Sequence, residues 1–99
     1  MKISLNDNTL DVSIVIPAMN EAANLEQLLP SLMETLEGLE ISYEVLVVDA
    51  DSPDATQAVV EEYGGRYICE AERGYGVALV RGFSEALGAY VITMDADLS

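Results

Sequence analysis

The sequence contains few positive charges, no histidine and no tryptophan. Four basic residues stand against 18 acidic ones, so the formal net charge over 99 residues is −14. Because nucleic acids need a basic face on their protein partners, this balance argues against nucleic acid as a partner, and it also opposes binding to anionic lipid surfaces. Cys69 is the only cysteine, which excludes a disulfide within the chain and fits a reducing compartment. We therefore expect a cytoplasmic location.

Long apolar runs are also missing. No stretch approaches the roughly 18 apolar residues that a membrane-spanning helix needs, and we expect no secretory signal in this chain. Apolar residues nevertheless make up 51% of the sequence. A chain of this length buries one hydrophobic core but not two, so we interpret it as a single small domain or a piece of one.

The apolar pattern alternates between strand and helix. β-branched runs predict four strands, at residues 12–16, 44–48, 66–70 and 90–94. Helical spacing predicts helices up to residue 38, over residues 55–63, and from residues 74–76 to 87. Asn20 is the expected N-cap of the first helix, and Ser52 or Asp54 that of the second. Pro30 predicts a kink or a restart in the first helix, because proline lacks the N–H for a helical hydrogen bond.

This alternation predicts the fold class. Strands that are apolar almost throughout and separated by helices indicate a parallel sheet covered on both faces. Right-handed crossovers then limit the α/β topology to a Rossmann-like, doubly wound sheet. Parallel strands present their carboxyl ends at one edge, where such folds bind ligands. The loops at residues 17–21, 49–52, 70–76 and 95–97 should therefore converge there.

Two carboxylates, Asp95 and Asp97, directly follow the last predicted strand. Hard divalent cations such as Mg²⁺ and Mn²⁺ prefer oxygen ligands and often share them between one or two carboxylates and a substrate diphosphate. The pair thus indicates a metal site that bridges to phosphate. The alternative is a solvated turn, which any acidic chain contains by chance.

Four segments in order resemble the motifs of family 2 glycosyltransferases of the GT-A fold: VSIVIPAMNE at 12–21, VVDADSPDAT at 47–56, ERGYG at 72–76 and DADLS at 95–99. Within that family the sequence is most similar to polyprenol-phosphate sugar transferases of the dolichyl-phosphate mannose synthase type. The resemblance implies strand order 3-2-1-4, a UDP- or GDP-sugar donor, Mg²⁺ or Mn²⁺ on the diphosphate, inversion at the sugar carbon, and an acceptor such as a polyprenyl phosphate.

The resemblance also implies roles for residues near the nucleoside. It places Pro17, Ala18 and Glu21 there, with Asp49 accepting hydrogen bonds from the base or ribose, a task that suits a carboxylate. Asp51 belongs to the same second motif and is included in the expected site. Two alternatives stay open, because Asp49 also suits a turn or helix cap and Glu21 also suits the positive end of a helix dipole.

Further roles concern the diphosphate. The resemblance places Asp95 near the ribose and on the metal, with Asp97 as the principal metal ligand. Arg73 is the only cation expected at the rim and is suited to pair with the diphosphate, unless it is an ordinary surface arginine. Gly74 would let the backbone approach the ligand, although Gly-x-Gly also simply starts helices.

Two of the motifs depart from the family pattern. Met19 stands where the family often has an aromatic residue that stacks on the base. In the second motif, Ala50 and Asp51 replace the commoner Asp-Gly, so one carboxylate is shifted rather than lost. These departures leave open which base is bound.

The resemblance implies that a complete enzyme continues well beyond the metal motif. We therefore interpret residues 1–10 as a leader and 11–99 as the nucleotide-sugar-binding part of a truncated transferase, with no catalytic residue in this fragment and little transfer by it alone. The longer protein is expected to be membrane-associated in some form. The last strand would then expose an unpaired edge, which predicts a homodimer through that edge.

Two rival classes remain at this point. The chain is alternatively a nucleotide- or metal-binding module without chemistry, which a transfer assay on a longer protein would separate from an enzyme. A sugar nucleotidyltransferase should show a glycine-rich, basic phosphate loop after the first strand, and residues 17–21 have neither feature.

Overall fold

The computed structural model describes residues 9–96, and residues 1–8 and 97–99 lie outside the description. The elements in chain order are β1 (Leu10–Ala18), α1 (Ala22–Gly38), β2 (Tyr43–Asp49), α2 (Thr56–Glu62), β3 (Arg66–Cys69), α3 (Tyr75–Glu85) and β4 (Gly88–Thr93). Every predicted strand and helix is present. β1 begins earlier than expected, at Leu10, within the segment predicted as a leader.

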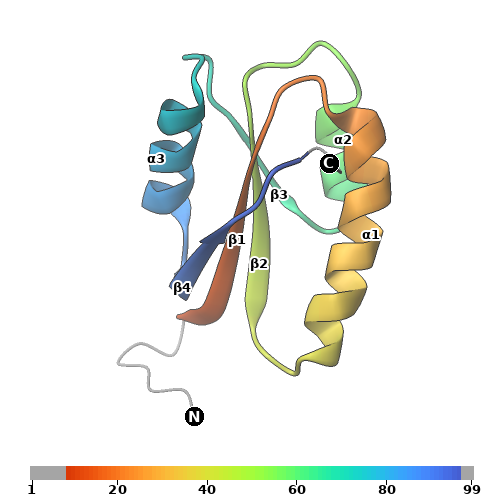
Figure 1. Ribbon diagram of the computed structural model, residues 1–99, viewed down its shortest axis with the longest axis vertical. Coiled ribbons are helices and arrows are strands. Elements are labelled where there is room, and N and C mark those ends of the chain that lie inside the picture. Colours follow the sequence, from red (N-terminus) through yellow and green to blue (C-terminus); the bar gives the residue numbers. More distant parts are fainter. Residues whose placement is uncertain (1–8, 97–99) are drawn as a thin grey trace.

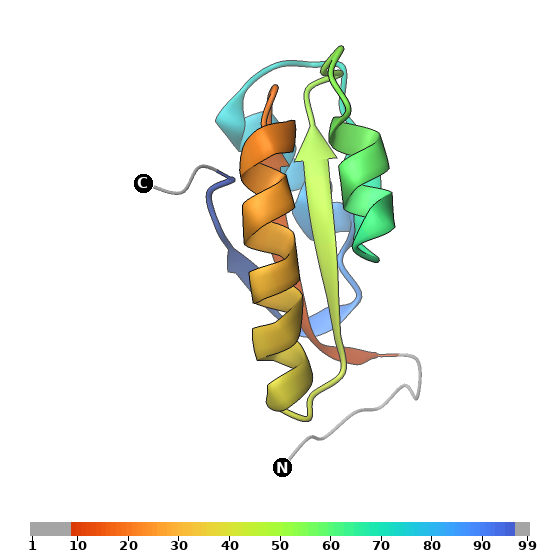
Figure 2. The same ribbon diagram turned by 90° about the vertical axis from the view of Figure 1, so that its right-hand side faces the viewer.

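The four strands form one parallel sheet in the order β3-β2-β1-β4, which confirms the predicted topology. The sheet is the central layer, with α3 on one side and α1 and α2 on the other (Figure 1). In the perpendicular view α1 and α2 lie next to each other over β2 (Figure 2). The carboxyl ends of the strands therefore share one edge, as the sequence predicts.

The central strands are buried on both faces. In β1, Ile14 and Ile16 pack with Leu25 and Leu29 of α1 in the larger core cluster. Val15 lies between them in sequence and belongs to the second cluster, on the α3 face. This alternation follows from the period of two in a β-strand, and apolar residues at every position satisfy both layers.

The sheet is not covered everywhere. In β4, Tyr90, Val91 and Ile92 are 73%, 39% and 48% exposed. The expectation of a sheet covered on both faces is therefore wrong at this strand. Because side chains of a strand alternate between the two faces of the sheet, the exposure of Tyr90, Val91 and Ile92 leaves both faces of β4 partly uncovered. Among those residues, no helix has the length and apolar character required to span a membrane.

One local expectation about α1 is also wrong, and another is narrowed. Asn20 does not cap the helix, because its φ of 54° places it in the left-handed region and Glu21 occupies the N-cap without a side-chain capping bond. Of the kink or restart expected at Pro30, the restart does not occur, because Pro30 lies on the exposed side of one continuous helix, Ala22–Gly38. The expected N-cap of α2 is wrong as well: Ala55 occupies the N-cap without a side-chain capping bond, although the Asp54 carboxylate accepts a hydrogen bond from the Thr56 backbone N–H at 3.0 Å.

Candidate functional site

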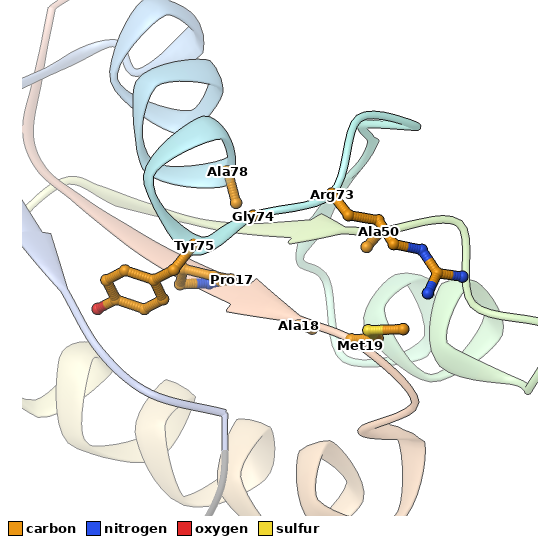
Figure 3. A pocket seen from close by; sticks show the side chains of 8 residues that line it. All are labelled: Pro17, Ala18, Met19, Ala50, Arg73, Gly74, Tyr75 and Ala78. Atoms are coloured by element: carbon orange, nitrogen blue, oxygen red, sulfur yellow. The ribbon is translucent and has the colours of Figure 1, made fainter.

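A pocket of about 300 Å³ lies at the carboxyl edge of the sheet, where β1 and β2 meet the N-terminus of α3. Its lining residues are Pro17, Ala18, Met19, Ala50, Arg73, Gly74, Tyr75 and Ala78. Figure 3 shows the side chains of Tyr75 and Arg73 at opposite ends of this pocket. Apart from these two polar side chains the walls are apolar. Such a pocket suits a ligand with a flat, weakly polar body and an anionic group.

Four of the predicted site residues, Pro17, Ala18, Arg73 and Gly74, line this pocket together. The sequence interpretation did not assign Tyr75 or Ala78 to the site. These two residues are three positions apart at the start of α3, so they share the helix face next to Arg73 and Gly74. That spacing, read from the predicted helix start, is the signal that would have identified them.

Arg73 differs from the other described arginines in having no carboxylate partner. Arg66 and Arg81 both pair with Glu85, at 3.7 Å and 3.2 Å. Arg73 makes no ion pair or hydrogen bond with any described residue, and it lines the pocket. In a chain with a net charge of −14, an arginine that pairs with no described carboxylate is available to bind an anion.

The start of α3 adds further donors beside Arg73. Gly74 directly precedes the helix and has a φ of 135°. Residues other than glycine rarely adopt this backbone conformation. The first N–H groups of a helix lack intrahelical acceptors and carry the positive end of the helix dipole. A guanidinium and the N-terminus of a helix therefore both line this pocket, and each of them suits phosphate.

Asp49 takes part in a turn rather than in the pocket wall. It is fully buried, and its Oδ2 accepts hydrogen bonds from the Tyr67 hydroxyl at 2.7 Å and the Ser52 backbone N–H at 2.9 Å. Its Oδ1 accepts a further short bond from the Ser52 hydroxyl. These bonds correspond to the turn role that the sequence left open for Asp49, and its direct contact with the nucleoside stays a prediction.

Hydrogen bonds join the loop after β2 to the loop after β1. The Asn20 backbone N–H donates to the Ser52 hydroxyl oxygen at 2.7 Å, and the Ala22 N–H donates to Asp54 Oδ2 at 3.3 Å. The hydroxyl of Thr56, followed by the backbone N–H groups of Thr56 and Ala22, lowers the pKa of Asp54. The two loops that supply Met19 and Ala50 to the pocket are therefore held together by side-chain oxygens.

Glu21 and Asp51 are absent from the pocket lining. Glu21 Oε2 accepts a hydrogen bond from the side chain of Asn24 at 2.7 Å, at the start of α1. Asp51 is exposed, with a φ of 57°, and its Oδ1 lies 3.7 Å from the Cys69 sulfur. Desolvation, together with the negative charge of Asp51, raises the pKa of the Cys69 thiol.

Asp95 stands just beyond the end of β4. It is exposed and has no hydrogen-bond or ion-pair partner among the described residues. The next residue, Ala96, is only 4% exposed and packs in the larger core cluster, so the turn after β4 is held against the protein body. Asp97 lies outside the described residues.

The free carboxylate of Asp95 is a hard oxygen donor that suits Mg²⁺ or Mn²⁺. Among residues 9–96, no group of three or more His, Cys, Asp or Glu side chains gathers as a metal site. This arrangement still fits these ions, because they commonly take one or two protein carboxylates and complete their coordination with phosphate and water.

Comparison with known proteins identifies the family. Residues 13–99 match the family described as Glycosyl transferase family 2. The chain belongs to glycosyltransferase family 2. It is 42% identical over 94 residues to a dolichol-phosphate mannosyltransferase of Pyrococcus furiosus, a match that covers 90% of this chain and 26% of that protein. The chain thus spans about a quarter of the length of this family 2 relative.

Solved structures share the fold. Mannosyl-3-phosphoglycerate synthase from Rubrobacter xylanophilus superposes with a TM-score of 0.81 at 32% identity, over 89% of this chain and 31% of that chain. A mannosyltransferase from Pyrobaculum calidifontis, in complex with GDP-Man and Mn²⁺, superposes with a TM-score of 0.75 at 28% identity, over 92% and 28%. The described sheet therefore has the GT-A arrangement that the sequence predicted for a family 2 member.

Proposed function

We propose that this chain is the nucleotide-sugar-binding part of a family 2 glycosyltransferase, which transfers a sugar from a UDP- or GDP-sugar to an acceptor with inversion. The observation that carries the proposal is the pairing of an apolar pocket with the one described arginine that lacks a carboxylate partner. The family membership and the complex of a similar mannosyltransferase with GDP-Man and Mn²⁺ support the proposal.

The proposed binding mode assigns one part of the ligand to each part of the pocket. Arg73 and the first N–H groups of α3 bind the diphosphate, since both present donors and positive charge. The nucleoside lies against the apolar wall that Pro17, Ala18 and Met19 form at the end of β1. The sugar then extends toward the turn that carries Asp95, at the same edge of the sheet.

Asp95 and Asp97 would hold Mg²⁺ or Mn²⁺ in this proposal. The bound ion supplies positive charge to the diphosphate and so makes it a better leaving group. This chain's own contribution is to place one exposed carboxylate at the sheet edge, on a turn fixed by the buried Ala96. Arg73 supplies further positive charge at the phosphates.

We propose a polyprenyl phosphate as the acceptor, because a 42% identical relative is named a dolichol-phosphate mannosyltransferase. The chain spans 26% of the length of that relative, and the resemblance implies no catalytic residue within it. We therefore expect this chain to bind the donor but to transfer little sugar by itself. A non-catalytic binding module would share that result, and it would also remain inactive within a longer protein.

Isothermal titration calorimetry tests the donor assignment. UDP and GDP should bind, Mn²⁺ should tighten both, and uridine and guanosine should bind more weakly because they lack the diphosphate. Asp97→Ala should remove the effect of Mn²⁺ without removing nucleotide binding. If neither diphosphate binds with or without Mn²⁺, the proposed function is wrong, and if Asp97→Ala leaves the Mn²⁺ effect intact, the metal assignment is wrong.

We also propose that two copies associate through the edge of β4. Tyr90, Val91 and Ile92 are exposed on a strand that pairs with β1 on one side only among the described residues. Residues 74–94 contain one basic and one acidic residue, so this region lacks the charge that would keep copies apart. Antiparallel pairing of two β4 strands about a two-fold axis satisfies their free backbone groups.

Sedimentation velocity over a salt series tests this association. Dimers should increase with salt, because salt screens the net charge of −14. Ile92→Lys should restore monomers, whereas Leu39→Lys, which replaces another exposed apolar residue on a different surface, should not. A monomer at high protein concentration in molar salt would contradict the proposal.

A further inference from the structure

A chain of hydrogen bonds runs from β3 to the loop that follows β1. The Tyr67 hydroxyl donates to the buried Asp49 carboxylate at 2.7 Å. The same carboxylate accepts bonds from the backbone N–H and the hydroxyl of Ser52. The Ser52 oxygen in turn accepts the Asn20 backbone N–H at 2.7 Å. These hydrogen bonds therefore link, one after another, four residues that come from β3, from β2 and from the loops after β2 and β1.

This chain of bonds ends beside the pocket. Asn20 follows Met19, which lines the pocket, and the φ of Asn20 is 54°. A non-glycine residue in the left-handed region is held there at some cost, so it needs contacts that stabilise it. The bond to Ser52 is such a contact. Ala50, on the opposite side, donates its N–H to the Ala18 carbonyl at 3.1 Å, which joins the same two loops.

Tyr67 is therefore the member of this chain of hydrogen bonds that is furthest along it from the pocket wall at Met19. Burial, together with the Asp49 carboxylate, raises the pKa of Tyr67, so its hydroxyl stays protonated and remains a donor. Without this donor, Asp49 would keep only its bonds to Ser52 and would be free to shift toward water. The aromatic ring itself packs against the larger core cluster.

We propose that Tyr67 is a positioning residue for the nucleotide pocket, which it does not line. Through Asp49 and Ser52, its hydroxyl holds the backbone at Asn20 and so the position of Met19 against the nucleoside. The inference rests on the proposed function, because it assigns the pocket to a nucleotide.

Tyr67→Phe tests the inference, because it removes the hydroxyl and keeps the ring. Tyr43→Phe is a matched control, since the Tyr43 hydroxyl also donates to a carboxylate, Glu37, at 2.7 Å, far from the pocket. Calorimetry with GDP and UDP should show a loss of affinity of about three- to tenfold for Tyr67→Phe, the effect of one net hydrogen bond. The control should bind as the wild type does, at a temperature where both variants are folded.

Amide hydrogen exchange without nucleotide gives a second readout, which a uniform loss of stability would not produce. Exchange at Asn20 and Ser52 should accelerate in Tyr67→Phe more than exchange in the core of β2, and it should be unchanged in Tyr43→Phe. Ser52→Ala removes the hydroxyl between Asp49 and Asn20, and it should reproduce both the loss of nucleotide affinity and the faster exchange. This variant replaces Tyr67→Phe in the test if Tyr67→Phe fails to fold.

The outcomes separate the two proposals. If the wild-type chain binds neither diphosphate, the proposed function fails and this inference fails with it. If the wild type binds and both Tyr67→Phe and Ser52→Ala bind equally well, only the inference is overturned. Equal losses of affinity in Tyr67→Phe and Tyr43→Phe would overturn it as well, because they would show a general effect of stability.

Discussion

Replacement of Arg73 by glutamine tests the binding mode most directly. The side chain has no partner among the described residues, so its loss breaks no internal bond and should leave the melting temperature unchanged. What changes is the positive charge at the pocket. A nucleoside diphosphate should therefore bind more weakly to Arg73→Gln, while the corresponding nucleoside should bind as it does to the wild type.

The expected magnitude follows from the exposure of Arg73. A hydrogen bond to a charged group is worth about 1.5–3 kcal/mol. Arg73 is exposed, so solvent screening favours the lower end, about 1.5–2 kcal/mol. At about 1.4 kcal/mol for each factor of ten, UDP or GDP should bind roughly 10- to 30-fold more weakly. Calorimetry at low ionic strength measures this difference well.

Arg81→Gln provides the matched control. It removes the same charge, but from an arginine that pairs with Glu85 at 3.2 Å and Glu70 at 3.4 Å. The net charge of the two variants is identical, so a long-range electrostatic effect would appear in both. Unchanged diphosphate affinity in Arg73→Gln, or the same loss in Arg81→Gln, would refute a direct contact between Arg73 and phosphate.

Two further predictions concern stability. Gly82→Ala should lower the free energy of unfolding, measured in urea titrations, by about 1–3 kcal/mol, because the new Cβ would lie 2.3 Å from Val15 Cγ1. Gly76→Ala should instead stabilise α3 by up to about 1 kcal/mol, because nothing lies within 4 Å of the new Cβ. Equal effects of the two substitutions on the free energy of unfolding would contradict this packing. Since the folded-state pKa of Asp54 is lowered, its contribution to stability is present above the ordinary aspartate pKa of about 4 and is lost as the pH falls further. Asp54→Asn should flatten the decline of stability as the pH falls below about 4, where the unfolded chain takes up this proton before the folded one does, and an unchanged pH profile would exclude this carboxylate as a source of the decline.

The strands and helices followed from local patterns in the sequence, whereas the sheet order was implied by the resemblance to family 2 glycosyltransferases. β-branched runs and helical spacing indicate strands and helices because each depends on neighbours within a few positions. The ordered motifs then indicated the family, and the parallel order β3-β2-β1-β4 agreed with it. Even the choice of Pro17, Ala18, Arg73 and Gly74 for the site corresponds to one pocket in the structure.

The role of each polar group was less accessible from the sequence. Asparagine is a common helix N-cap, but the backbone N–H of Asn20 donates a hydrogen bond to the hydroxyl of Ser52, 32 positions away. That contact requires the two loops to lie side by side, which only the packed sheet brings about. The uncovered face of β4 was missed for a similar reason, because its apolar residues look the same in sequence as those of the buried strands.

The sequence by itself determined which segments become strands and helices, which edge of the sheet carries the polar loops, and that those loops include carboxylates and one arginine. Only the tertiary structure decided which of these groups remain available to a ligand. The Asp49 carboxylate accepts hydrogen bonds from Tyr67 and Ser52, whereas Arg73 has no carboxylate partner among the described residues. The physical reason is that availability depends on partners distant in the chain, and their distances are set by how the helices and strands pack.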